Sequence, residues 1–206
     1  MSCCQDYTKG VGNISLIIGP MFSSKSTTLI SKVNRYAIAG RRCTLIKWEG
    51  DNRYDDIVKE DDGLNGKGVV THDGQIYPSI ALKANQFVRW CEQEVKKSDS
   101  EEDKYDVVGI DEGQFFNGLS YGCELLANAG YVVVVAGLSG TSNKTLFEEI
   151  GRLIPVSDNI LFLKAVCVDC RERSASFSKR ICKGNDKVII GGIDKYLAVC
   201  RKCFNK

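Results

Sequence analysis

Gly19-Pro20-Met21-Phe22-Ser23-Ser24-Lys25-Ser26 is the stretch of this sequence that decides the fold. An apolar run, residues 14–18, precedes it, and a segment with apolar side chains at helical spacing, Thr27 to Ala39, follows it. A strand, a turn and a helix in this order hold phosphate groups, because backbone N–H groups and the positive helix end face the anion. Lys25 would reach the outer phosphates, and the Ser26 hydroxyl would be placed for Mg²⁺.

One position departs from the phosphate-loop pattern, which has glycine where this chain has Ser24. Serine would be costly there if the backbone needed a positive φ. Because the position opens a helix, we expect helical backbone angles and a small cost. The alternative interpretation of the whole stretch is a strand-to-helix turn with a capping serine.

The length of 206 residues is enough for one sizeable core with a small appendage. No apolar run approaches the roughly 20 residues that a membrane span needs, and residues 1–6 lack the pattern of a signal peptide. We therefore expect a cytoplasmic protein with a disordered arm at residues 1–12. In that compartment the ten cysteines would be buried thiols, reactive thiols or metal ligands rather than disulfides.

Apolar strands alternate with amphipathic helices along most of the chain, which predicts an α/β fold with a parallel, doubly wound sheet flanked by helices. This phosphate-loop (P-loop) nucleotide-binding domain would span residues 13–165. The expected strands are 14–18, 43–48, 105–110, 131–136 and 160–163, and the expected helices are 27–39, about 80–97, 119–129 and 146–153.

Polar side chains follow two of these strands, at the sheet edge where ligands of parallel sheets collect. Asp51 and Arg53 follow the second strand and could help to hold a metal-bound triphosphate. Asp111 and Glu112 follow the strand that ends at Ile110; Asp111 would orient Mg²⁺ through water, and Glu112 would act as general base toward an attacking hydroxyl. An exposed turn is the alternative for such an acidic pair.

His72 is the only histidine, and two interpretations of it stay open: a partly buried residue that fixes a turn, or a site residue beside Asp73.

Two Cys-x-x-Cys pairs mark a second domain, residues 166–206. They are Cys167/Cys170 and Cys200/Cys203, with 29 residues between them. Four thiolates form a closed tetrahedral zinc site, which would stabilise a segment too small to hold a core alone. Four buried thiols are the alternative. Cys182 falls outside the pairs, residues 173–180 suggest a flexible loop, and residues 188–192 suggest a strand that leads into a glycine turn.

The charge of the chain is uneven. The formal net charge is +2, but residues 167–206 hold ten Lys or Arg against four Asp or Glu. Such a segment could attract nucleic acid or a phosphorylated ligand. No basic run is longer than two residues, so a solvated surface is the better interpretation, and nucleic-acid binding is not expected.

Taken together, these motifs resemble the type II thymidine kinases, a family of zinc-containing cytosolic kinases found in animals, bacteria and large DNA viruses. The resemblance runs from about residue 13 to 204. Its most specific parts are Asp111-Glu-Gly-Gln-Phe-Phe116 and Ile190-Gly-Gly-Ile-Asp-Lys-Tyr196; the other parts are the 19–26 loop, Asp51-Asn-Arg-Tyr54, Thr71-His-Asp73 and the two cysteine pairs.

The resemblance implies transfer of the ATP γ-phosphate to the 5′-hydroxyl of thymidine or deoxyuridine, with Mg²⁺ and structural Zn²⁺. It also implies a homotetramer, feedback inhibition by thymidine triphosphate, no membrane association, and a lasso loop at residues 174–180 that closes over the base. The implied general base is Glu112. The implied ATP-binding residues are Gly19, Pro20, Met21, Phe22, Ser23, Ser24, Lys25, Ser26, Asp51, Asn52, Arg53, Asp111 and Gln114, and magnesium would be held by Ser26, Asp111 and Asp51. The implied substrate-binding residues are Phe115, Leu138, Ser142, Phe147, Lys187, Val188, Ile189, Ile190, Gly191 and Tyr196. The implied zinc ligands are Cys167, Cys170, Cys200 and Cys203.

Some positions depart from the family pattern. Besides Ser24, Ser139 and Ser142 stand where the family has Asp and Phe, and Phe177 replaces a lasso tyrosine. A lost aromatic contact at Ser142 would weaken base binding by roughly 0.5–1.5 kcal/mol. These departures motivate the alternative of a catalytically weakened nucleotide-binding relative with a regulatory role. A third alternative, suggested by the basic C-terminal segment, is a zinc-ribbon protein that binds nucleic acid. It ranks last, because it would give Glu112 no role.

Overall fold

The structure is a computed structural model that describes residues 10–51, 68–70, 76–98, 101, 103–182 and 191–206. Within these residues, no helix has the length and apolar character that crossing a membrane requires. Asn52, Arg53, Lys187, the 188–190 part of the expected strand, and Thr71-His-Asp73 lie outside the described residues.

A six-stranded sheet forms the centre of the molecule, in the order β5-β2-β6-β7-β1-β8 with every neighbouring pair parallel. Its strands are β1 (Asn13–Gly19), β2 (Cys43–Trp48), β5 (Ile80–Leu82), β6 (Val107–Ile110), β7 (Val132–Leu138) and β8 (Asn159–Phe162). The parallel sheet expected from the alternation of strands and helices is therefore confirmed.

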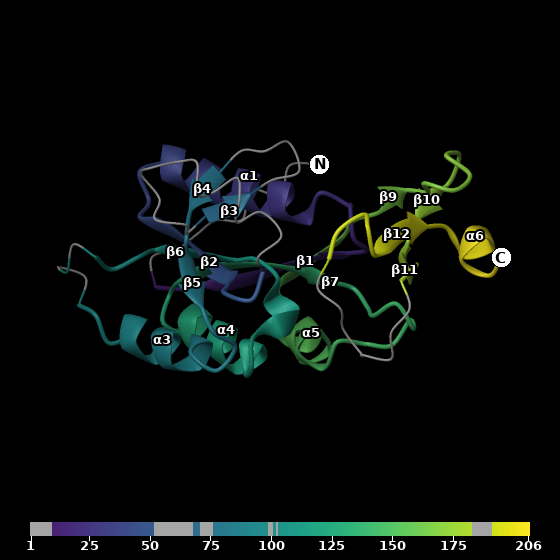
Figure 1. Cartoon of the computed structure of the whole chain (residues 1–206). Helices are drawn as coiled ribbons and strands as arrows, with labels where there is room; N and C mark the ends of the chain where they lie inside the picture. Colours follow the sequence, from purple (N-terminus) through teal and green to yellow (C-terminus); the bar gives the residue numbers. More distant parts are fainter. Residues whose placement is uncertain (1–9, 52–67, 71–75, 99–100, 102, 183–190) are drawn as a thin grey trace.

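Helices cover both faces of the sheet (Figure 1). On one face lie α1 (Lys25–Ile38) and the hairpin of β3 (Gly68–Val70) and β4 (Ile76–Pro78). On the other lie α3 (Phe87–Glu94), α4 (Leu119–Asn128) and α5 (Glu148–Leu153). Short 3₁₀ turns η1 (Gly113–Phe115) and η2 (Ile154–Val156) follow β6 and α5. Each face has its own apolar core, because strand side chains alternate between the faces: Leu45 packs toward α1, and Ile46 packs toward α3 and α4.

The helix expected at about residues 80–97 is only partly correct. Residues 80–82 form the edge strand β5, in which Ile80 lies opposite Ile46 and Leu82 opposite Trp48, and the helix begins at Phe87. The spacing from Phe87 to Cys91 is truly helical, since both residues are fully buried. Residues 80–82 join the sheet because their backbone groups pair with β2, which local spacing cannot reveal.

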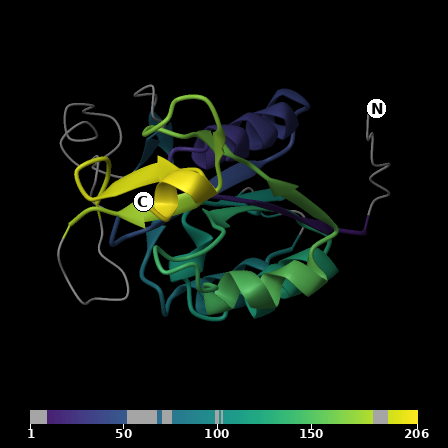
Figure 2. The same cartoon turned by 90° about the vertical axis from the view of Figure 1, so that its right-hand side faces the viewer.

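The described residues of the C-terminal segment, 165–182 and 191–206, lie at the end of the sheet where β1 and β7 end, and Figure 2 shows them in front of the sheet. The segment contains β9 (Ala165–Val166), β10 (Ser174–Ala175), β11 (Phe177–Arg180), β12 (Tyr196–Val199) and α6 (Arg201–Phe204). The flexible loop expected at residues 173–180 is wrong, because β10 pairs with β9 and β11 pairs with β12. The segment also has its own small core, around Ala175 and Ala198.

Candidate functional site

The 19–26 loop joins β1 to α1 with two residues in the left-handed region, Phe22 at φ 62° and Ser24 at φ 59°, ψ 34°. The expectation that Ser24 has helical backbone angles is therefore wrong. The capping role is also absent, since Ser24 makes no side-chain capping hydrogen bond. At Gly19 a Cβ atom would lie 2.6 Å from the Leu163 carbonyl oxygen, so a close approach of backbone requires glycine there.

Hydrogen bonds hold the side chains of this loop in place. The Ser23 hydroxyl donates to the Pro20 carbonyl oxygen at 2.8 Å, and the Lys25 ammonium donates to the same oxygen at 2.7 Å. The Ser26 hydroxyl donates to Asp111 Oδ1 at 3.0 Å. The structure thus brings together the serine and the carboxylate that the sequence assigned to one magnesium site.

Two buried carboxylates lie at the carboxyl ends of neighbouring strands. Asp111 follows β6 and is 7% exposed, and Asp51 follows β2 and is 6% exposed. The backbone N–H of Asp111 donates to the carbonyl oxygen of Ile46 in β2, which joins the two strands where they end. Carboxylates and hydroxyls are the ligands that Mg²⁺ prefers, so Ser26, Asp51 and Asp111 are chemically suited to hold it.

Glu112 lies next to Asp111 in a left-handed conformation, with φ 53° and ψ 41°. Its Oε2 accepts a hydrogen bond from Gln114 Nε2 at 2.5 Å, and Gln114 Oε1 accepts one from the Leu138 N–H at 3.0 Å. Non-glycine residues in this region of φ/ψ carry strain of about 1–3 kcal/mol and concentrate at functional sites. The carboxyl end of β6 therefore presents a half-buried carboxylate that is fixed by a neighbouring strand.

An aromatic cluster lies beside this carboxylate. The Phe115 ring is 4.2 Å from the Trp48 ring, centroid to centroid, and 6.4 Å from the Phe147 ring in an edge-to-face arrangement. The family resemblance implies that Phe115 and Phe147 both bind the substrate, and the structure brings their rings together. Trp48 was missed, although an aromatic residue at the carboxyl end of a predicted strand was a usable signal.

The other expected substrate residues that the structure describes lie in β7, in the turn after it, and at or before β12. Leu138 ends β7, and Ser142 is half-buried in the turn that follows, where the Thr141 and Thr145 hydroxyls are 2.6 Å apart. Tyr196 is buried at the start of β12, and Gly191 precedes that strand in the described residues. Both belong to the C-terminal segment, whereas the aromatic cluster is formed by residues 48, 115 and 147.

A hydrogen bond ties the 19–26 loop to the C-terminal segment. The N–H of Met21 donates to the hydroxyl of Ser178 in β11 at 2.9 Å, and both residues are buried. Phe22 packs against the small core of the C-terminal segment. Sequence reasoning missed Ser178, because the two residues are far apart in the chain and a lone serine in a charged stretch carries no signal.

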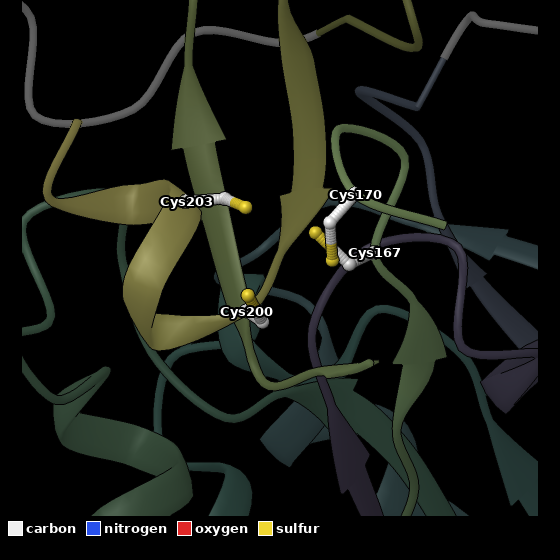
Figure 3. Close-up of side chains that lie close together, drawn as sticks. All are labelled: Cys167, Cys170, Cys200 and Cys203. Carbon is white, nitrogen blue, oxygen red and sulfur yellow. The ribbon is translucent and has the colours of Figure 1, made fainter. Parts of the chain in front are cut away.

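The four paired cysteines converge on one point (Figure 3). Cys167 and Cys170 come from the turn after β9, Cys200 from the end of β12, and Cys203 from α6. Their sulfur atoms all lie within 4.8 Å of one another. A tetrahedral site with Zn–S bonds of about 2.3 Å places the sulfurs about 3.8 Å apart, so this group fits a structural zinc ion.

The thiols of this cluster differ in pKa. Burial opposes ionisation of Cys167, but backbone hydrogen bonds from Cys170, Cys200 and Asp169 outweigh it and lower the pKa of Cys167 to about 6. Backbone hydrogen bonding from Cys203 lowers the pKa of Cys200. A hydrogen bond to Asp169 raises the pKa of Cys203. Thiolate is the form that binds zinc, so part of the ligand set is already favourable near neutral pH.

Comparison with known proteins agrees with this geometry. The family model described as thymidine kinase matches residues 12–204. The thymidine kinase of rabbit fibroma virus is 43% identical over 193 residues, which cover 94% of this chain and 96% of the viral protein. The thymidine kinases of variola virus and Acanthamoeba polyphaga mimivirus are 45% and 40% identical over the same share of this chain, with 97% and 82% of those proteins covered. The chain therefore belongs to the thymidine kinase family.

Proposed function

We propose that this protein transfers the γ-phosphate of ATP to the 5′-hydroxyl of thymidine, and of deoxyuridine, in cytoplasmic pyrimidine salvage. The observation that carries the proposal is the hydrogen bond between Ser26 and Asp111, which joins the 19–26 loop to the strand that presents Glu112. A loop that cradles phosphates, a carboxylate suited to magnesium and a base beside them are the parts that phosphoryl transfer requires.

In this proposal the 19–26 loop holds the triphosphate, with help from Asp51, Asn52, Arg53 and Asp111. Mg²⁺, held by Ser26, Asp51 and Asp111, would neutralise charge on the phosphates. Glu112 accepts the proton of the 5′-hydroxyl as that oxygen bonds to the γ-phosphorus and the bond to ADP breaks.

The substrate base would lie against the aromatic cluster of Trp48, Phe115 and Phe147, because flat rings stack favourably on one another. Leu138 and Ser142 would form a further wall. The C-terminal segment, proposed as a zinc-binding lasso domain from residue 166, would contribute Gly191, Tyr196 and residues 187–190.

Self-association, which the proposed homotetramer requires, is supported by the edge strand β8. Its outer edge has no strand partner among the described residues, and Ile160, Leu161 and Phe162 are 38–50% exposed. An apolar strand with a free edge favours pairing with a second copy. Thymidine triphosphate would inhibit as a mimic of the product and its phosphates.

The test of the function is Glu112→Gln, assayed with Mg-ATP and a panel of deoxynucleosides, with and without thymidine triphosphate. We expect the wild type to phosphorylate thymidine and the variant to keep its fold and lose roughly 10²–10⁴-fold in turnover, the usual share of a general base. Near-normal turnover of the variant would remove Glu112 from its role.

One observation favours the second candidate, a weakened nucleotide-binding relative. Ser24 has the left-handed backbone that suits the glycine it replaces, so the 19–26 loop carries strain. Transfer of labelled phosphate from ATP to thymidine at ordinary kinase rates, about 1–100 per second, would exclude this candidate.

A further inference from the structure

Gln114 forms a bridge between Glu112 and the end of β7. The side chain is 7% exposed in the turn η1. One end of its amide contacts Glu112 Oε2 at 2.5 Å, and the other end contacts the Leu138 N–H at 3.0 Å.

The chemistry of the two partners fixes the orientation of this amide. A backbone N–H can only donate, so Gln114 Oε1 has to face Leu138 and its NH₂ group has to face Glu112. The NH₂ group has hydrogen atoms and no acceptor, so it stabilises a carboxylate oxygen that accepts. Each carboxylate oxygen has two lone pairs, and a hydrogen bond at Oε2 leaves the carboxylate able to accept a proton.

The neighbouring strand is shaped around this side chain. A Cβ atom at Gly137 would lie 3.1 Å from Gln114 Oε1 and 2.6 Å from Ile150 Cδ1. Gly137 therefore leaves room for the amide where β7 passes it. Glu112 itself has a left-handed backbone, which persists only where surrounding contacts hold it.

We propose that Gln114 is a positioning residue that acts through Glu112. It holds Oε2 and thereby aims the other oxygen, Oε1, at the substrate hydroxyl. Oε1 takes the hydroxyl proton while the new O–P bond forms and the bond to ADP breaks, and the proton then passes to solvent. The inference rests on the proposed function of Glu112. The amide has a second N–H and Oε1 has a second lone pair, so a contact of Gln114 with ATP would be compatible with the bridge.

The bridge also links the base to the substrate pocket. Leu138, whose N–H holds Gln114, is one of the proposed pocket residues. A shift of β7 on substrate binding would therefore move Gln114 and, with it, the Glu112 carboxylate. Positioning of this kind affects the rate of the bound complex more than the affinity for either substrate.

The experiment is a double-mutant cycle with Gln114→Met and Glu112→Ala in the full-length protein. Met has nearly the volume of Gln but neither hydrogen bond. In the wild-type background we expect Gln114→Met to lower kcat about 10- to 100-fold, the range for one lost hydrogen bond to a charged group, and to change the KM for ATP by less than about 2-fold. In the Glu112→Ala background we expect the same change to lower kcat by less than about 3-fold, because its partner is gone.

Asp158→Ala is the matched control. It removes the carboxylate whose Oδ2 accepts a hydrogen bond from the Ile14 N–H, at the amino end of β1 and so at the opposite edge of the sheet. We expect it to lower the melting temperature without changing kcat. Direct ATP binding by Gln114 would instead raise the KM for ATP, and the fold-changes in kcat caused by the two substitutions would multiply as for independent sites. That result would overturn the inference. Unchanged kcat in Gln114→Met would overturn it while leaving the proposed function intact, whereas a wild type without turnover would overturn both.

Discussion

Ser24→Gly tests the backbone conformation of the 19–26 loop. Ser24 has φ 59° and ψ 34°, and its side chain is exposed and makes no capping hydrogen bond. Its carbonyl oxygen accepts hydrogen bonds from the Thr28 N–H and hydroxyl, which glycine would preserve. The substitution therefore changes the backbone preference and little else.

The expected gain follows from two opposing terms. A left-handed non-glycine residue costs about 1–2 kcal/mol relative to helical angles. Glycine would avoid this strain, but about 0.5–1 kcal/mol of the gain is lost again, because the glycine backbone loses more conformational entropy on folding. We expect Ser24→Gly to stabilise the protein by about 0–1.5 kcal/mol, which corresponds to a rise of up to about 6 °C in the melting temperature of a chain of this length. The KM for ATP should be unchanged or lower.

Matched variants separate the backbone from the hydroxyl. Ser24→Ala keeps the Cβ atom and removes only the hydroxyl, so it should be no more stable than the wild type. Ser24→Asn should be at least as stable as the wild type, because asparagine tolerates left-handed angles better than serine does. The free energy of unfolding of each variant is measured by urea unfolding, and the KM for ATP is measured from initial rates at varied ATP. Destabilisation by Ser24→Gly of more than about 0.5 kcal/mol, or a higher KM for ATP, would contradict a strained backbone at Ser24.

Three further predictions concern contacts that hold the site and the fold. Ser178→Ala should destabilise the protein by about 1–3 kcal/mol in urea unfolding, because the buried Met21 N–H loses its acceptor. Ser178→Thr keeps a hydroxyl and should restore stability. Equal stability of the wild type and both variants would contradict the role of this hydrogen bond. Lys97→Met should cost about 1–3 kcal/mol, because Glu94, which is 1% exposed, loses an ammonium at 3.0 Å; Lys97→Arg should lose less. Cys200→Ser should lower bound zinc, measured by elemental analysis, from one per chain to well below one, and should lower the melting temperature; retention of zinc would rule Cys200 out as a ligand.

Local sequence was sufficient for the elements that are buried throughout. The apolar runs before the 19–26 loop and Asp111 form β1 and β6, since a parallel strand covered on both faces needs continuous apolar side chains. The three-residue strand β5 was not predictable in this way. It exists because β2 offers unpaired backbone groups at its edge, and no pattern within residues 80–82 records that partner.

The same distinction, between features that local sequence records and features that depend on distant partners, applies to the candidate site. The meeting of Ser26 with Asp111 followed from the rule that parallel strands end at one edge, and paired cysteine spacing placed four sulfurs together. The contact of Met21 with Ser178 depends on how two distant segments pack, and the Ser24 backbone depends on the path of the loop. Neither is set by residue type.

The position of β1 has a consequence for the order of folding. It is the strand that leads into the 19–26 loop, yet its two neighbours, β7 and β8, come from residues 132–138 and 159–162. Pairing over such sequence distances is slow, because a long stretch of chain must be closed before the contacts form. During synthesis the ribosome therefore releases β1 and the 19–26 loop long before the strands that flank β1 exist. We expect nucleotide affinity to be among the last properties that a refolding molecule regains, after the helical signal has recovered.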